Sequence, residues 1–270
     1  MEATSHTHLS VTIGQHSAAG RKPSNQDFHG ALVPEGSERL IKGITLAVAD
    51  GISSSTVSHE AAENAVKALM TDYYSTSDAW TVKTAACRVI SATNSWLYGE
   101  NRRARVADMN HGRVCTLSAL ILKGCNAHIF HIGDSRIWRV SNDSLEPLTE
   151  DHRIVLSESE NYLGRSIGST DQVEVDYRQE ILSRGDIFLL TTDGLHEFWD
   201  PLQVLQTIRT APSFDIAAEK IVQDALDRGS NDNLTLQIAR IDNLPAGSDS
   251  SGLVDDTLSL PIGELPKAGS

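Results

Sequence analysis

The chain has 270 residues, enough to bury one substantial hydrophobic core, and no break in composition divides it before about residue 243. Its formal net charge of -13, with no run of Lys and Arg, argues against a broad nucleic-acid-binding face. The N-terminal residues lack the apolar segment of a signal peptide, and no apolar run is long enough to cross a membrane, so we expect a soluble, cytoplasmic protein with no membrane partner. Cys87, Cys115 and Cys125 show no CxxC spacing, which favours a reducing compartment and argues against a structural zinc site.

The N-terminal part of the chain predicts strands and two long helices. Leu9, Val11 and Ile13 alternate with polar residues, as is typical of a half-buried strand. Two later stretches have apolar residues at helical spacing, so each is expected to pack one face on a sheet. The expected strands lie at about residues 9–13, 28–33 and 44–49, and the expected helices at about residues 56–73 and 79–105.

The rest of the chain predicts a meander of strands followed by two more helices. Strands are expected at about residues 115–122, 127–132, 137–140, 173–177, 187–192 and 234–238, with a short one ending at 148–152. Residues 157–168 are expected to form a loop, and the helices to lie at about 201–210 and 214–227. This order favours antiparallel sheet with helices packed outside it. From about residue 243 the composition is that of a disordered linker or tail.

Four aspartates stand beside the ends of predicted strands. Asp50 and Asp193 each follow an apolar run and precede a glycine, Asp134 ends a third apolar run, and Asp232 precedes the last strand. A single apolar run that ends in Asp-Gly would indicate only a strand followed by a turn. If the four converge, their like charges repel unless cations or protons are bound. Ligands that are all oxygen favour magnesium or manganese over zinc or copper.

A polar turn near the N-terminus holds a basic pair, Arg21 and Lys22, a few residues before Asp27. Taken alone, the turn is a loop with two solvated cations. Beside a metal cluster, a fixed guanidinium could bind phosphate oxygens through two parallel hydrogen bonds. The sequence therefore offers a candidate phosphate-binding group next to the candidate metal site.

Six short motifs in register resemble those of the metal-dependent protein serine/threonine phosphatases of type 2C, in their bacterial form. They cover about residues 9–241 in the order that the family shows. The motifs are Asn25-Gln26-Asp27, Ala49-Asp50-Gly51, Ile132-Gly133-Asp134-Ser135-Arg136, Leu148-Thr149-Glu150-Asp151-His152, Thr192-Asp193-Gly194-Leu195 and Asp232-Asn233-Leu234-Thr235. The resemblance implies an α/β (α+β) fold, a four-layer αββα sandwich of two antiparallel sheets flanked by helices.

The resemblance also implies which residues hold the metal ions. Asp50 would bridge two metal ions, with the Gly51 carbonyl on one of them, and Asp193 and Asp232 would hold the other. Asp134, together with Asp193, matches a third metal position of bacterial members. We therefore expect two or three Mn2+ or Mg2+ ions as cofactors.

Other motif residues would support this centre. Asp27 would steady a metal-bound water, while Gln26 stands where some relatives have Glu, and Asn233 would lie beside the metal ligand Asp232. Two divalent ions about 3.5–4 Å apart lower the pKa of a bridging water and neutralise phosphoryl charge, so no protein nucleophile is needed. The absence of a Ser-His or Cys-His signature agrees with this chemistry.

Three departures from the family pattern affect the prediction. Many relatives carry the phosphate-binding Arg five positions before the motif aspartate, whereas here Arg21 lies six before Asp27 and Lys22 lies five before it. We choose Arg21 for its forked geometry, with Lys22 as the competitor. Ile52 replaces a His that serves some relatives as general acid, so no general acid is assigned. The segment at 152–168 is shorter than the usual bacterial one, which includes a mobile flap.

The resemblance implies an enzyme that hydrolyses phosphoserine and phosphothreonine in proteins by direct attack of metal-activated water. Its expected partners are a phosphorylated protein substrate and a cognate serine/threonine kinase. The alternatives are a catalytically weak docking or sensor module and a hydrolase for small phosphoesters. We expect a phosphatase domain at residues 1–243 and a linker or tail at 244–270, which is also compatible with the phosphatase portion of a bifunctional kinase/phosphatase.

Overall fold

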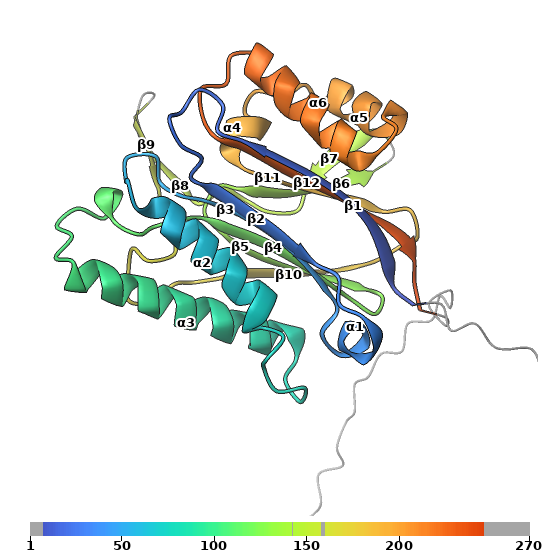
Figure 1. Cartoon of the computed structure of the whole chain (residues 1–270), viewed down its shortest axis with the longest axis horizontal. Coiled ribbons are helices and arrows are strands. Elements are labelled where there is room, and N and C mark those ends of the chain that lie inside the picture. Colours follow the sequence, from blue (N-terminus) through green and yellow to red (C-terminus); the bar gives the residue numbers. More distant parts are fainter. Residues whose placement is uncertain (1–7, 142, 158–159, 246–270) are drawn as a thin grey trace, which may run out of the picture.

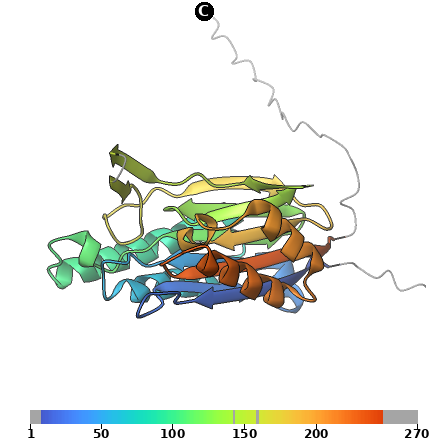
Figure 2. The same cartoon turned by 90° about the horizontal axis from the view of Figure 1, so that it is seen from above.

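A computed structural model describes residues 8–141, 143–157 and 160–245 of the chain (Figure 1). Two five-stranded antiparallel sheets pack face to face, and helices cover the outer face of each (Figures 1 and 2). The predicted sandwich of two antiparallel sheets flanked by helices is confirmed. Nearly all of the predicted linker at 244–270 lies outside the described residues.

The two sheets draw their strands from distant parts of the chain. The first sheet has the order β1-β12-β11-β6-β7, with β1 at Ser10–Ala18, β6 at Arg136–Ser141, β7 at Ser144–Pro147, β11 at Ile187–Thr191 and β12 at Leu234–Asn243. The second has the order β10-β5-β4-β3-β2, with β2 at Asp27–Leu32, β3 at Ile44–Asp50, β4 at Leu117–Lys123, β5 at Asn126–Ile132 and β10 at Asp176–Ile181. A separate hairpin joins β8 (Arg153–Ser157) to β9 (Glu160–Leu163).

The helices divide between the two outer faces of the sandwich. Those beside the second sheet are α2 at Ser58–Thr71 and α3 at Val82–Arg103, and those beside the first are α4 at Asp193–His196, α5 at Pro201–Thr210 and α6 at Phe214–Asp227. A short α1 at Gly36–Lys42 joins β2 to β3, and a single 3-10 turn lies at Met109–His111. None of the helices in the described ranges is long and apolar enough to cross a membrane.

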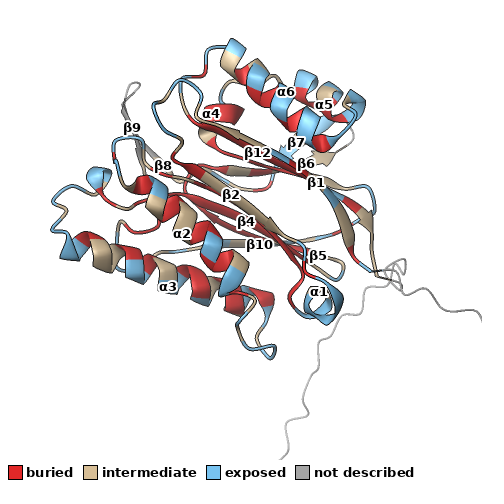
Figure 3. Ribbon diagram, in the orientation of Figure 1, coloured by how far each residue is buried: buried red, intermediate tan, exposed pale blue. Residues whose placement is uncertain are grey.

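Strand β3 shows how the sequence builds the layers. Its side chains alternate between two hydrophobic clusters, with Leu46 and Val48 facing the other sheet and Ala47 and Ala49 facing α2 and α3. Both faces of the strand are therefore buried, as the continuous apolar run predicts (Figure 3). The small alanines let the helices pack close to the sheet. This interior strand ends in Asp50.

Most predicted elements are present, and the bounds of α5 and α6 match those expected. Helix α1 was not predicted, because its large apolar residues Leu40 and Ile41 are exposed and give no core-facing pattern. The prediction of a loop at 157–168 was wrong for residues 160–163, which form β9 and pair with β8. Cys87, Cys115 and Cys125 are all free.

Substituting Leu46→Ala should test the core between the sheets. Leu46 is fully buried, so the lost contacts and the remaining cavity should lower the free energy of unfolding by about 2–5 kcal/mol. Denaturant unfolding measures this change. Leu202→Ala is the control, because Leu202 is 73% exposed and its loss should change stability by no more than about 0.5 kcal/mol. Equal effects of the two substitutions would contradict the described packing.

Candidate active site

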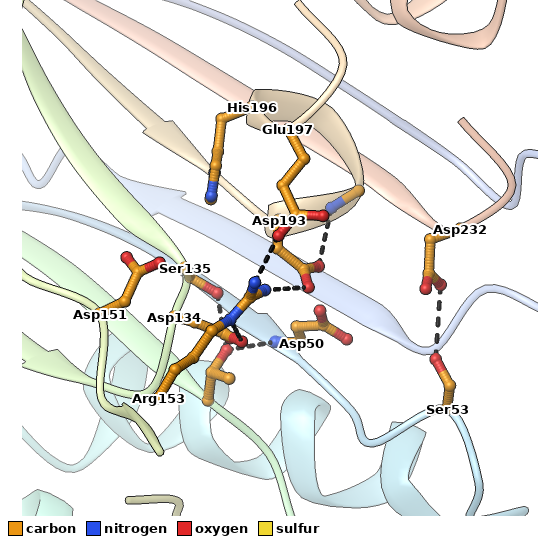
Figure 4. Close-up of polar contacts among 12 residues, drawn as sticks. Asp50, Ser53, Asp134, Ser135, Asp151, Arg153, Asp193, His196, Glu197 and Asp232 are labelled. Carbon is orange, nitrogen blue, oxygen red and sulfur yellow. Dashed lines mark hydrogen bonds and ion pairs between the residues drawn. The ribbon is translucent and has the colours of Figure 1, made fainter. Parts of the chain in front are cut away.

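The aspartates predicted to bind metal lie around one small cavity where strand ends from both sheets meet (Figure 4). Asp50 ends β3, Asp193 begins α4 directly after β11, and Asp232 lies just before β12. The cavity has a volume of about 150 Å3. Its lining residues are Asp50, Ile52, Ser53, Thr116, Asp134, Leu163, Asp193 and Asp232. A larger cavity of about 510 Å3 beside β5 and β10 contains none of the predicted site residues.

Asp27 lies next to this cavity and is buried. It faces Asp50 across the β2–β3 pair, a position in which two like charges destabilise a sheet. Thr192 Oγ1 and Thr235 Oγ1 donate hydrogen bonds to Asp27 Oδ2, at 2.9 Å and 2.6 Å. Asp27 Oδ1 is also buried, and no residue in the described part of the chain donates a hydrogen bond to it. Leaving a buried carboxylate oxygen without a hydrogen-bond donor costs free energy. This atom is therefore a candidate acceptor for a water or another ligand of the site.

Burial and mutual repulsion shift the acids toward their protonated forms. Burial, and then the charges of Asp27, Asp193 and Asp134, raises the pKa of Asp50 well above its usual range. Burial, followed by Asp134, raises the pKa of Asp193 to about 6. Burial likewise raises the pKa of Asp27 to about 7, although its two threonine donors act against the shift. Bound divalent cations would compete with these protons for the same oxygens.

Gln26, Gly51 and Asn233 fix the backbone around the acids. Asn233 Oδ1 accepts a hydrogen bond from the Gln26 N–H at 2.9 Å. The side-chain nitrogen of Asn233 donates to two backbone carbonyls in the turn that precedes Gln26. The Gln26 side chain donates to Ser58 Oγ at 2.8 Å. A Cβ on Gly51 would lie 2.8 Å from the backbone of Ser58, so only glycine fits where β3 meets α2.

The structure brings Lys22, not Arg21, to the cavity. Lys22 Nζ lies 3.2 Å from Asp232 Oδ1 and donates a hydrogen bond to Ser53 Oγ at 3.2 Å. Arg21 is exposed and makes no hydrogen bond or ion pair with any described residue. The choice of Arg21 over Lys22 is therefore not supported, because Asn233 holds the turn in a conformation that directs Lys22 inward. Ser53 was not predicted, although it follows the Asp50-Gly51 motif closely.

Arg153 is the main site residue that the sequence analysis missed. Its Nε donates to Asp134 Oδ2 at 2.7 Å, its Nη2 to Asp193 Oδ2 at 2.8 Å, and its Nη1 to Glu197 Oε1 (Figure 4). Asp134 thus lies at the cavity, as predicted, but pairs with a guanidinium. The motif that ends at His152 stops one residue short of Arg153. Its position directly after that motif was the available signal.

The site offers only a few protein oxygen ligands, which suits a divalent cation that keeps part of its water shell. Within the part of the chain that the structure describes, no three acid, His or Cys side chains are arranged to hold one ion by themselves. Mg2+ needs only one or two carboxylates, because water and carbonyl oxygens complete its shell. Asp50, Asp193 and Asp232 line the cavity and, with the Gly51 carbonyl, offer oxygen ligands only, which meets that requirement.

Comparison with known proteins agrees with the fold. A sequence model described as Protein phosphatase 2C matches residues 15–235. A putative protein phosphatase 2C-type of Streptococcus pyogenes is 27% identical over 253 residues, which cover 85% of this chain and 95% of that protein. The serine/threonine phosphatase stp of Listeria monocytogenes is 28% identical over 255 residues, with 84% and 94% covered.

Solved structures show the same fold at lower sequence identity. Serine/threonine phosphatase Stp1 from Staphylococcus aureus superposes with a TM-score of 0.75 at 17% identity, over 90% of this chain and 100% of that one. The catalytic domain of the serine threonine protein phosphatase PstP, in complex with two manganese ions, has a TM-score of 0.70 at 21% identity. That alignment covers 87% of this chain and 100% of the PstP chain.

The shifted pKa of Asp27 predicts a pH-dependent effect of Asp27→Asn in metal-free protein. Because native Asp27 binds its proton more tightly than the unfolded chain does, its contribution to stability is full at low pH and is lost as pH rises from about 4 through about 7. The neutral Asn has no such loss. The variant should therefore gain stability relative to wild type over this range, by a few kcal/mol. Denaturant unfolding with chelator at several pH values measures the difference, and parallel curves would contradict it.

Proposed function

This chain belongs to the protein phosphatase 2C family and is a metal-dependent serine/threonine protein phosphatase, and we propose that the cavity between Asp50, Asp193 and Asp232 is its active site. One observation carries the proposal. Acids from both sheets converge on this cavity with an unpartnered Asp27 oxygen beside them, an arrangement that costs stability unless it serves a ligand. We assign the phosphatase domain to residues up to about 243, where β12 ends.

Asp50, the Gly51 carbonyl, Asp193 and Asp232 would hold the metal ions. Manganese and magnesium both accept such oxygen ligands, and the related PstP was solved with two manganese ions. When bound, the ions would supply a lowered water pKa and would neutralise charge on the phosphoryl group.

The chain's own side chains would orient the reactants. Asp27 Oδ1 is buried, unpartnered and close to Asp50, so it can accept a hydrogen bond from the attacking water. Lys22 Nζ lies at the rim of the cavity, where an ammonium can bind a phosphate oxygen as a point charge. Ser53 Oγ accepts from Lys22 and donates to Asp232 Oδ1 at 3.4 Å, so it links the cation to the acid.

The size of the cavity favours a phosphoprotein over a small metabolite as substrate. Small-molecule sites usually enclose about 300–1,000 Å3. A cavity of about 150 Å3 has room for a phosphoryl group but leaves the rest of the substrate outside. The phosphoserine or phosphothreonine side chain of a protein meets this condition. Because a protein kinase must produce such a substrate, we propose a cognate serine/threonine kinase as the functional partner.

Asp193→Asn should abolish most of the phosphatase activity. The change removes a charge that the metal ions need, and loss of several kcal/mol of charge stabilisation corresponds to a rate decrease on the order of 100-fold or more. The assay is hydrolysis of a phosphothreonine peptide by metal-stripped protein with Mn2+ or Mg2+ added back. Asp171→Asn makes the same charge change on an exposed residue outside the cavity and should leave activity unchanged. If metal-replete wild-type protein hydrolysed neither phosphopeptides nor aryl phosphates, the assignment of phosphatase activity would be refuted.

Lys22→Ala and Arg21→Ala form a matched pair for the phosphate-binding group. Removal of a charged hydrogen bond costs about 1.5–3 kcal/mol, so Lys22→Ala should lower kcat/KM for the peptide by roughly 10- to 100-fold. Arg21→Ala should change it by less than about 2-fold, because the exposed Arg21 makes no contact in the cavity. Steady-state kinetics at saturating metal compares the two. A larger loss of kcat/KM in Arg21→Ala than in Lys22→Ala would identify Arg21 as the phosphate-binding residue.

A further inference from the structure

Arg153 is the cation that the structure places among the acids of the cavity. Its guanidinium contacts Asp134, Asp193 and Glu197 through three different nitrogens (Figure 4). Its side chain is 24% exposed and Asp134 is more deeply buried, at 13%. Arg suits this position, because its planar fork can hold several carboxylates at once and is more weakly hydrated than a Lys ammonium.

The segment before Arg153 is fixed on both sides. Asp151 accepts two hydrogen bonds from Arg136, at 2.7 Å and 2.8 Å. The His152 N–H donates to the Gly133 carbonyl at 2.7 Å, and His152 Nδ1 accepts from the Gly133 N–H at 3.0 Å. The backbone that carries Arg153 is thus anchored beside the loop that carries Asp134. The backbone at Arg153 is therefore already ordered, and only side-chain entropy is lost when the guanidinium meets its acids.

Arg153 and a metal ion would compete for the same oxygen atoms. The contacts use Asp134 Oδ2 and Asp193 Oδ2, while Asp193 Oδ1 accepts from the Gly194 N–H at 2.7 Å. A divalent ion that binds both Asp134 Oδ2 and Asp193 Oδ2 would have to displace the guanidinium from these two atoms. The anchored backbone would then keep a positive charge beside the ion, which is unfavourable in a partly buried site.

We propose that Arg153 is the resident cation of the Asp134–Asp193 pair and takes the place of a third metal ion. On the proposed function, this chain then binds two divalent ions, and Asp134 serves as an anchor for Arg153 instead of a metal ligand. The expectation of a third metal at Asp134 and Asp193 is replaced by this assignment. Arg153 also begins β8, so the same contacts tie the β8–β9 hairpin to the active site.

Counting bound Mn2+ tests the proposal independently of activity. Metal-stripped wild type, Arg153→Ala and Arg153→Ala/Asp134→Asn are titrated with Mn2+ while the free ion is followed by electron paramagnetic resonance. We expect two bound ions in wild type, a third in Arg153→Ala, and loss of that third ion in the double variant. Three ions in wild type, or no gain in Arg153→Ala, would overturn the proposal.

Two further variants serve as a control and as a direct test of Asp134. Arg165→Ala removes another Arg of the same segment, which pairs with Asp176 and Glu174 and not with the cavity acids, so the count should stay at two. The single variant Asp134→Asn should still bind two Mn2+ ions, with affinities within about 2-fold of wild type. This measurement remains informative even if Arg153→Ala fails to fold. Loss of a bound ion in Asp134→Asn would show that Asp134 is a metal ligand and would refute the assignment. Binding of no Mn2+ by wild type would instead refute the proposed function.

Discussion

Repulsion among carboxylates that the fold gathers at one point is the constraint on which the rest of the site depends. Asp27 and Asp50 face each other across adjacent strands, and Asp193 approaches from the other sheet. Such a group persists only where protons, hydrogen-bond donors or cations offset its charge. The chain provides hydrogen-bond donors to Asp27 and two cations, Lys22 beside Asp232 and Arg153 beside Asp134. The remaining deficit of positive charge is what divalent ions would supply.

The two packed sheets explain why the acids cannot move apart to relieve this repulsion. Strand β3 is buried on both faces, so Asp50 extends from the most constrained part of the core. Thr192 and Thr235, both fully buried, tie Asp27 to the other sheet. The rigidity that holds like charges together would also fix the proposed metal ligands within the small positional tolerance that catalysis needs.

The sequence predicted the parts of the site that repeat as local patterns, and missed those that depend on tertiary contacts. Asp50 and Asp193 could be found because an apolar run followed by Asp-Gly marks a buried strand end. Lys22 could not be preferred over Arg21, since the direction of each depends on a turn held by Asn233 from far along the chain. Arg153 has no local signal beyond its neighbours, because the acids that hold it come from other elements.

The pairing of β1 with β12 has a consequence for protein engineering. Ser10 pairs with Asn243, so the first and last described strands begin and end at the same edge of the sandwich. Because β12 leaves the cavity at Leu234 and continues for 10 residues, this edge lies about 33 Å from the site. A fluorescent protein or affinity module fused directly before Ser10 or directly after Asn243 would therefore be remote from substrate. Joining Ser10 to Asn243 by a short linker and opening the chain at an exposed loop should give circular permutants that keep the cavity intact.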